Sequence, residues 1–177
     1  MTKKDLGVFS KIIGMNNAAD TAFLGIIEQN GFYYAFNKYM AVRTAEKPEL
    51  DMVPEKYQRA DTYERLEQHF EDVFSEDSCL VALPTKSEII SLRKKLTAEE
   101  KREKPYLLTS TNDMLIAVNN SYLSLFLDLF GIADCSCYAR SPVKALYFIN
   151  RKNGIEGILF PIYITDYTKA MNAKVRD

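Results

Sequence analysis

Two adjoining stretches decide the fold: residues 119–131, NNSYLSLFLDLFG, and residues 134–165, DCSCYARSPVKALYFINRKNGIEGILFPIYIT. The first predicts a short helix with one apolar side, capped at its start by Asn119 or Asn120 and closed by Gly131. The second predicts three strands, of which the last two are joined through a tight Asn153-Gly154 turn. We place these strands at Cys135–Arg140, Val143–Asn150 and Ile155–Thr165. Nothing in either stretch has the pattern of a catalytic site.

Another hairpin is predicted upstream, around the Asn30-Gly31 pair. This dipeptide stands between two apolar, aromatic and β-branched runs, which is the strongest short-range signal for a hairpin. Strands are expected at about 23–29 and 32–44, with a kink or turn near Asn37-Lys38. Ahead of them, the spacing of apolar residues within 6–19 indicates a short helix or a transition from helix to strand.

The segment between residues 48 and 77 differs in composition from its surroundings. Prolines mark a loop, and a helix is then predicted at 61–75, beginning at Asp61. One side of this helix is apolar and is formed by Tyr63, Leu66, Phe70, Val73 and Phe74. The opposite side is mostly acidic, which is typical of a solvated face; an electrostatic partner site is the alternative.

The remaining middle part completes a mixed pattern. A buried strand is expected at Cys79–Pro84, a helix at 86–96 after a Thr85–Glu88 capping box, and a hairpin within 106–118. Each predicted helix follows strands and precedes strands. We therefore predict a single α+β domain over residues 1–177, with antiparallel sheets, two helices packed on one face, and a further amphipathic helix at 61–75.

The composition is that of an ordinary globular protein. The chain has 177 residues, 47% of them hydrophobic, and a formal net charge of −1. A module that binds nucleic acid with one whole face usually has a basic excess, so DNA contact here needs a local patch or several copies. Three cysteines without disulfide spacing favour a reducing cytoplasm, and no run approaches the roughly 18 apolar residues of a membrane span.

Residues that commonly perform catalysis are sparse. His69, the single histidine, falls within the predicted helix at 61–75 without a nucleophile motif beside it, which favours an exposed helix histidine. Cys135 and Cys137 share one face of a strand but lack two further ligands, which favours packing over zinc binding. Phosphate-binding glycine motifs are absent from the sequence. We therefore expect no enzyme, no cofactor and no metal.

One basic cluster is a candidate for contact with DNA phosphates. It comprises Arg93, Lys94, Lys95, Lys101, Arg102 and Lys104. Acidic residues are interspersed in it, at Glu99, Glu100 and Glu103, and weaken its positive field. A solvated charged face is the alternative interpretation.

Several short motifs, taken together, resemble the last part of a domain of the bacterial DNA sliding clamp, the processivity clamp family. They are Asn119-Asn120-Ser121-Tyr122-Leu123 at the start of a helix, Ser141-Pro142-Val143 ahead of a strand, and Leu159-Phe160-Pro161-Ile162 at the end of the last strand. Clamps have a similar Asn-x-x-Tyr-Leu pattern and a similar apolar-Met-Pro-Met run. The upstream hairpin, with Asn30–Ala35 and Met40–Arg43, is also similar, as is Leu83-Pro84 ahead of the helix at 86–96.

This resemblance implies two helices backed by antiparallel sheets, and domains that close into a ring around double-stranded DNA without covalent chemistry. Arg93, Lys94 and Lys95 would then face DNA. Partner proteins of the family insert a short apolar peptide beside the C-terminal strand, so Phe160, Pro161 and Ile162 would border such a cleft. As strand residues they also fit a core. A ring of chains this short would need many copies, so a homo-oligomer is expected. The helix at 61–75 has no counterpart in the family, so the segment at about 48–77 is expected to be an insertion.

The main functional hypothesis is a non-enzymatic, clamp-like accessory or interaction factor in DNA replication, of a phage or another mobile element. The alternative is a protein-binding module that retains the fold without binding DNA. A third hypothesis is a small enzyme with a site of scattered carboxylates and tyrosines. Asp128, in a predicted helix without basic residues, is unlike a residue of a DNA-facing helix.

Overall fold

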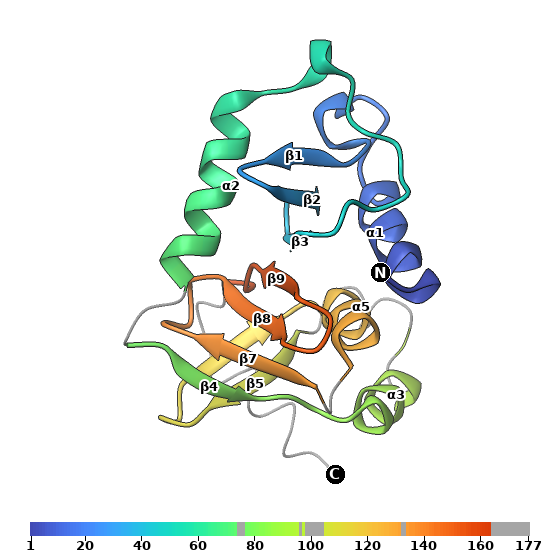
Figure 1. Ribbon diagram of the computed structural model, residues 1–177. Coiled ribbons are helices and arrows are strands. Elements are labelled where there is room, and N and C mark those ends of the chain that lie inside the picture. Colours follow the sequence, from blue (N-terminus) through green and yellow to red (C-terminus); the bar gives the residue numbers. More distant parts are fainter. Residues whose placement is uncertain (74–76, 96, 98–104, 132–133, 164–177) are drawn as a thin grey trace.

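A computed structural model of the chain describes residues 1–73, 77–95, 97, 105–131 and 134–163, with the side chains of residues 73, 86, 92 and 93 excepted. Its framework is a nine-stranded sheet with antiparallel neighbours in the order β1-β2-β3-β9-β8-β7-β4-β5-β6 (Figure 1). The strands are β1 Ile27–Gln29, β2 Phe32–Phe36, β3 Met40–Thr44, β4 Cys79–Ala82, β5 Tyr106–Ser110, β6 Leu115–Val118, β7 Cys135–Ala139, β8 Leu146–Asn150 and β9 Ile155–Leu159. The predicted α+β class is confirmed.

In the described part of the chain, three helices share one core on the same face of this sheet, where the sequence predicted two. They are α1 (Lys3–Gly14), α3 (Lys86–Lys95) and α5 (Asn120–Phe130), and each is followed in the chain by strands of the sheet. α5 contacts both α1 and α3. The additional member is α1, which buries Val8, Phe9 and Ile12 in the core that α5 also fills. We call these three helices the helix layer.

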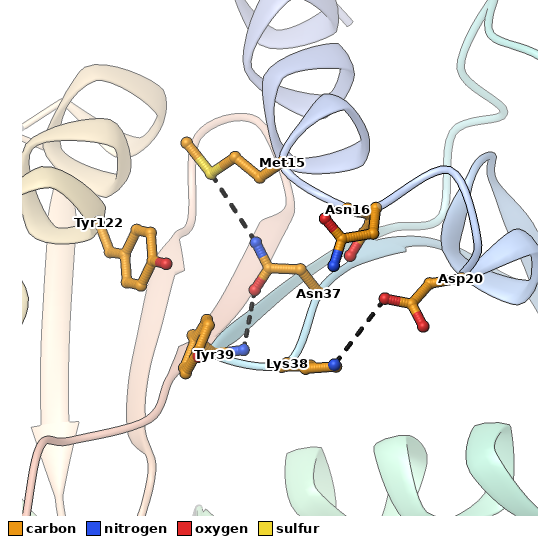
Figure 2. Close-up of a pocket in the computed structure, with 8 residues that line it drawn as sticks. Met15, Asn16, Asp20, Asn37, Lys38, Tyr39 and Tyr122 are labelled. Carbon is orange, nitrogen blue, oxygen red and sulfur yellow. Dashed lines mark hydrogen bonds and ion pairs between the residues drawn. The ribbon is translucent and has the colours of Figure 1, made fainter.

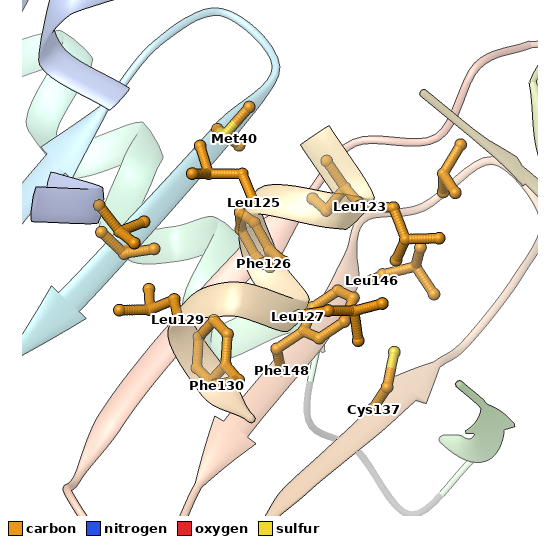
Figure 3. Packing of buried hydrophobic residues seen from close by; sticks show 14 of the residues in the cluster. Met40, Leu123, Leu125, Phe126, Leu127, Leu129, Phe130, Cys137, Leu146 and Phe148 are labelled. Carbon is orange, nitrogen blue, oxygen red and sulfur yellow. The ribbon is translucent and has the colours of Figure 1, made fainter. Parts of the chain in front are cut away.

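α5 is buried toward the sheet and toward its neighbouring helices. Figure 3 shows Leu129 leaving one side of the helix and Leu127 the other, and both are at most 6% exposed. Toward the sheet, the rings of Phe126 and Phe130 lie against Gly157 of β9. A Cβ atom at Gly157 would come within 2.8 Å of an atom of each ring, so the close approach requires glycine. The apolar sequence of α5 therefore follows from its central place in the helix layer.

The predicted amphipathic helix forms on the other face of the sheet. Figure 1 shows α2 (Ala60–Val73) and α1 on opposite sides of β1 to β3. The apolar side of α2 packs on a second core, through Tyr63, Leu66 and Phe70. Arg43 of β3 lies between the rings of Phe32 and Phe70, 4.4 Å from each centroid, and its guanidinium reaches the Glu156 carboxylate at 2.6 Å. This cation holds the sheet and α2 together.

Local turn and cap signals are confirmed by the backbone. Asn30 and Gly31 both have left-handed φ values, 51° and 81°, as the predicted tight hairpin requires. The side-chain oxygen of Asn119 accepts hydrogen bonds from the backbone N–H groups of Ser121 and Tyr122, and Gly131 closes the same helix with φ 66°. Short polar side chains and glycines therefore fix where α5 and the first hairpin begin and end.

Several predicted strands were too long. The predicted strand over 32–44 is two strands, β2 and β3, because the side chain of Asn37 accepts hydrogen bonds from the backbone N–H groups of Tyr39 and Met40 and makes a turn. The strand predicted from Ile155 to Thr165 ends at Leu159. Pro161 cannot donate to a strand ladder, which favours this end, and residues 164 and 165 lie outside the described part.

Candidate nucleic-acid interface

The outward surface of α1 carries lysines interspersed with glycine and serine, which have small side chains. A capping box between Thr2 and Asp5 starts the helix, and the buried side fixes its rotation on the sheet. The exposed positions are Lys3, Lys4, Gly7, Ser10, Lys11 and Gly14. At about 100° per residue, Lys4 and Lys11 lie within about 20° of each other around the helix axis. This surface was not among the predicted contacts, although its lysines are visible in the sequence as exposed positions of a short amphipathic helix.

α3 supplies the second basic part of the helix layer. Lys94 and Lys95 are exposed in its last turn, where the helix dipole also favours cations. Arg93 belongs to the same turn, but its side chain is not described, and Lys101 and Arg102 lie outside the described residues. The structure thus places two of the five predicted DNA-contact side chains on the surface, and contact with DNA stays a prediction for all five.

The central helix contributes little charge to this surface. Ser121 is exposed on α5, whereas Ser124 and Asp128 are half-buried. Among the described side chains, the outward surface of the helix layer is therefore neutral to weakly acidic along α5, and basic along α1 and in the last turn of α3. The first turn of α3 carries the exposed Glu88. A duplex on this surface would meet its cations at the two flanking helices.

The helix on the opposite face carries the opposite charge. α2 has the acidic residues Asp61, Glu64, Glu67, Glu71 and Asp72. Its one lysine or arginine is Arg65. Although the net charge of the chain is only −1, its charges are separated in space. Cations lie on the flanking helices of the helix layer, and acidic side chains lie on α2 across the sheet.

Two of the motifs that resemble a clamp, those at Tyr122 and Phe160, meet at Tyr39, in the turn between β2 and β3. The ring of Tyr122, in the first turn of α5, stacks on the Tyr39 ring with centroids 5.5 Å apart and an interplanar angle of 25°. The backbone N–H of Phe160, just after β9, donates a hydrogen bond to the Tyr39 carbonyl at 2.9 Å. Burial raises the pKa of the Tyr122 phenol, and the neighbouring Tyr39 raises it further. Its hydroxyl therefore stays neutral at physiological pH.

A small polar pocket opens beside this stacked pair (Figure 2). Its volume is about 130 Å³. It is lined by Met15, Asn16, Asn17, Asp20, Asn37, Lys38, Tyr39 and Tyr122. Lys38 and Asp20 face one another across 3.8 Å, while Tyr39 is 53% exposed. The pocket thus offers an aromatic ring, a cation and amide groups at the end of α1.

Of the predicted peptide-cleft residues, Phe160 is hydrogen-bonded to Tyr39 of this pocket, and none of the three is among the residues that line it. Phe160 packs against the second core, with its ring edge-on to the exposed His69 of α2 at 5.0 Å between centroids. Pro161 is half-buried and Ile162 is 36% exposed. The Ile162 backbone N–H donates to the Ala117 carbonyl of β6 at 2.7 Å. A role for these three residues in peptide binding stays a prediction.

The two cysteines of β7 do not form an exposed reactive site. Cys135 is half-buried and Cys137 is buried, and burial raises the pKa of the Cys135 thiol to about 12. Burial also raises the pKa of Cys137. Within the described residues, no three histidine, cysteine or carboxylate side chains gather where they would hold a metal ion. In that same part of the chain, no helix has the length and apolarity of a membrane span.

The fold defines the chain as clamp-like. No protein-family model matches the sequence, and no curated protein matches it either. Among solved structures, a protein of Eubacterium rectale assigned as a DNA polymerase III beta subunit superimposes with a TM-score of 0.60 at 8% identity. The DNA polymerase sliding clamp of Pseudomonas aeruginosa gives 0.56 at 12% identity, and the DNA polymerase III beta subunit of Thermotoga maritima 0.55 at 10%.

These matches cover most of this chain and only part of the clamp proteins. They span 91–92% of this chain but 63–65% of the three clamp chains. At identities this low the likeness establishes the fold alone. The resemblance seen in the short motifs is thereby confirmed as a divergent clamp-like fold, and what the clamps do is carried over only as a proposal.

Proposed function

We propose that this protein is a clamp-like accessory factor in DNA replication that places its helix layer against double-stranded DNA. The observation that supports this most is the division of charge between the two faces of the sheet. Among the described side chains, the exposed lysines of the helix layer are Lys3, Lys4, Lys11, Lys94 and Lys95. Phosphates are attracted to lysines gathered on one face even when the whole chain is neutral.

The surface of α1 also suits a close approach of the DNA backbone. Gly7, Ser10 and Gly14 fall on the same outward sector as Lys3. No atom would lie within 4 Å of a Cβ at Gly7 or Gly14, so packing within the described residues does not require glycine there. Short side chains beside lysines let phosphates come near without steric hindrance. The clamp-like fold supports a function in binding rather than in catalysis.

Partner binding and assembly complete the proposal. Phe160, Pro161 and Ile162 would border a site for a short apolar peptide of a replication protein, at the end of β9. The chain would act as a homo-oligomer of single domains, in which the segment at about 48–77, with α2, is an insertion. The arrangement of α2 on the face opposite the helix layer supports this, because an insertion there leaves the proposed DNA surface uncovered.

Charge reversal on the two faces tests the proposal. One variant reverses three charges of the helix layer, by Lys4→Glu, Lys11→Glu and Lys94→Glu. At about 0.05 M salt it should retain a fluorescent blunt duplex about tenfold or more weakly than the unmodified protein, because three phosphate contacts are lost. The matched control, Lys56→Glu, Arg59→Glu, Arg65→Glu, makes the same charge change at exposed positions at and before α2. It should leave retention nearly unchanged. Equal losses in both variants would contradict the helix layer as the DNA surface.

The second candidate is a protein-binding module that keeps the fold without DNA. The neutral central helix α5 and the net charge of −1 favour it. The same experiment separates the two functions. If the unmodified protein retains no duplex even at low salt, the DNA proposal fails and the protein-binding module is favoured.

A further inference from the structure

The pocket at Tyr39 lies at the end of α1 and has no role in the proposed contact with a duplex. Around α1, Met15 lies within about 40° of both Lys4 and Lys11, so the lysine line on α1 runs into the pocket that Met15 lines. A strand that follows these lysines would reach the exposed ring of Tyr39 next.

The position of Tyr39 is fixed by hydrogen bonds of its backbone, while its ring stays partly exposed. Its backbone N–H donates to the Asn37 side chain at 2.8 Å, and its carbonyl accepts from Phe160. One partner, Tyr122, stacks on its ring, yet Tyr39 remains 53% exposed. An aromatic ring fixed in this way loses little conformational entropy when a flat ligand stacks on it.

The groups around the ring suit a nucleotide. Lys38 keeps a side-chain exposure of 63%, and its pairing with Asp20 at 3.8 Å is the weak kind typical of exposed ions, so its ammonium group is available to a phosphate. Asn17 is exposed at the pocket wall, and amide groups can hydrogen-bond the edges of bases. Aromatic stacking with nearby cations is the common means of holding single strands without sequence preference.

We infer that Tyr39, stacked on Tyr122, is a platform for a base of single-stranded DNA, with Lys38 on the adjoining phosphate. This site would hold the unpaired strand where it leaves a duplex that lies on the helix layer. The inference rests on the proposed function for the duplex, but the binding of a single strand can be measured without it.

Four combinations of protein and oligonucleotide test the inference. The probes are a fluorescein-labelled oligothymidylate of about 16 nucleotides, near the upper site size of single-strand binders, and an abasic chain of equal length and charge. Tyr39→Ala should weaken binding of the oligothymidylate by about fivefold or more, the lower limit for losing one stacked base. The same substitution should leave the abasic chain unaffected, because the ring contacts the base rather than the phosphates.

Two further variants test whether the aromatic ring, and its place in the pocket, cause the effect. Tyr39→Phe retains the ring and should bind as the unmodified protein does, and Tyr57→Ala, which removes an exposed tyrosine elsewhere, should also have no effect. If Tyr39→Ala binds the oligothymidylate as tightly as the unmodified protein, or loses affinity equally for both probes, the inference is overturned. The first result would leave the pocket to a partner peptide.

The outcome is separable from that for the duplex. Reversal of Lys4, Lys11 and Lys94 should weaken both duplex and single strand, whereas Tyr39→Ala should weaken the single strand alone. Tyr39-dependent binding of the single strand without any retention of duplex would overturn the proposed function and uphold this inference.

Discussion

At the scale of single residues, the motif from Asn119 to Leu123 has three structural roles. Asn119 caps α5, Tyr122 stacks on Tyr39, and Leu123 is fully buried in the core beneath the helix layer. The cap fixes the first turn of α5, and this turn directs Tyr122 out to the pocket and Leu123 inward. A motif that suggested a family by its letters therefore also links the core to the candidate site.

Replacement of Gly157 should lower the stability of the protein, because this residue lies directly beneath the rings of α5. Gly157→Ala should lower the free energy of unfolding by about 1–3 kcal/mol, because its Cβ would overlap the rings of Phe126 and Phe130. Gly7→Ala is the matched control: the space around it is open, and alanine should stabilise α1 by about 0.5–1 kcal/mol. Urea denaturation measures both. A Gly157→Ala protein as stable as the unmodified one would contradict the packing of α5 on β9.

Buried tyrosines predict a loss of stability in alkali. Burial raises the pKa of Tyr147, and the neighbouring Glu156 carboxylate raises it further. The unfolded chain would release this phenolic proton at about pH 10, the folded chain only at higher pH, so stability falls as pH rises above about 10. Tyr147→Phe removes this contribution and should make the fall shallower in urea titrations at about pH 8 to 11. Tyr163→Phe, at a site 75% exposed, should leave the slope unchanged.

At the scale of elements, α2 is anchored to the sheet through a core of its own, on the face opposite the helix layer. Its apolar side shares a core with β1, β2, β3, β8 and β9, and the ring of Phe70 meets Tyr34 edge-on at 5.8 Å between centroids. Glu67 of α2 also accepts hydrogen bonds from the Asn30 side chain in the first hairpin. The segment proposed as an insertion is thus integral to the folded structure.

Truncation of Phe70 tests the importance of α2. Phe70→Ala should cost about 3–5 kcal/mol of unfolding free energy, because the ring is 2% exposed and also covers the Arg43 guanidinium. Gln68→Ala, on the exposed side of the same helix, should change stability by no more than about 0.5 kcal/mol. Equal, small effects would mean that α2 is only loosely attached to the sheet.

The same elements show what the sequence could predict and what it could not. Asn30-Gly31, Asn119 and Gly131 specify local backbone geometry, so the hairpin and α5 were predictable from a few residues. The stacking of Tyr39 on Tyr122 was not, because it depends on the strand order β3-β9-β8, which no local signal encodes. For the same reason the lysines of α1 could not be assigned to the same layer as those of α3.

At the scale of the whole molecule, the arrangement of charge matters more than its sum. The sheet with a helix on each face separates the outer surfaces of α1 and α2 by more than about 20 Å, since each helix is about 10 Å wide. This distance exceeds the Debye length of about 8 Å at physiological ionic strength. Acidic side chains on α2 would therefore do little to oppose a duplex placed on the helix layer at physiological ionic strength, and would oppose it more at low salt.

This separation gives the last prediction. Glu64→Lys, Glu71→Lys and Asp72→Lys together make the chain basic overall but alter only the exposed side of α2. At about 0.15 M salt the affinity for a blunt duplex should change by no more than about twofold, because screening isolates the helix layer from α2. At about 0.01 M salt, where the Debye length is about 30 Å, the affinity should rise clearly.

Fluorescence anisotropy across the salt range makes the comparison, with the helix-layer reversal Lys4→Glu, Lys11→Glu, Lys94→Glu beside it. That variant should lose affinity at every salt concentration and show a shallower salt dependence, because fewer counterions are released on binding. If the α2 variant gains tenfold or more at about 0.15 M salt, net charge rather than the helix layer governs binding. The unmodified protein's division of charge between its two faces would then carry no functional meaning.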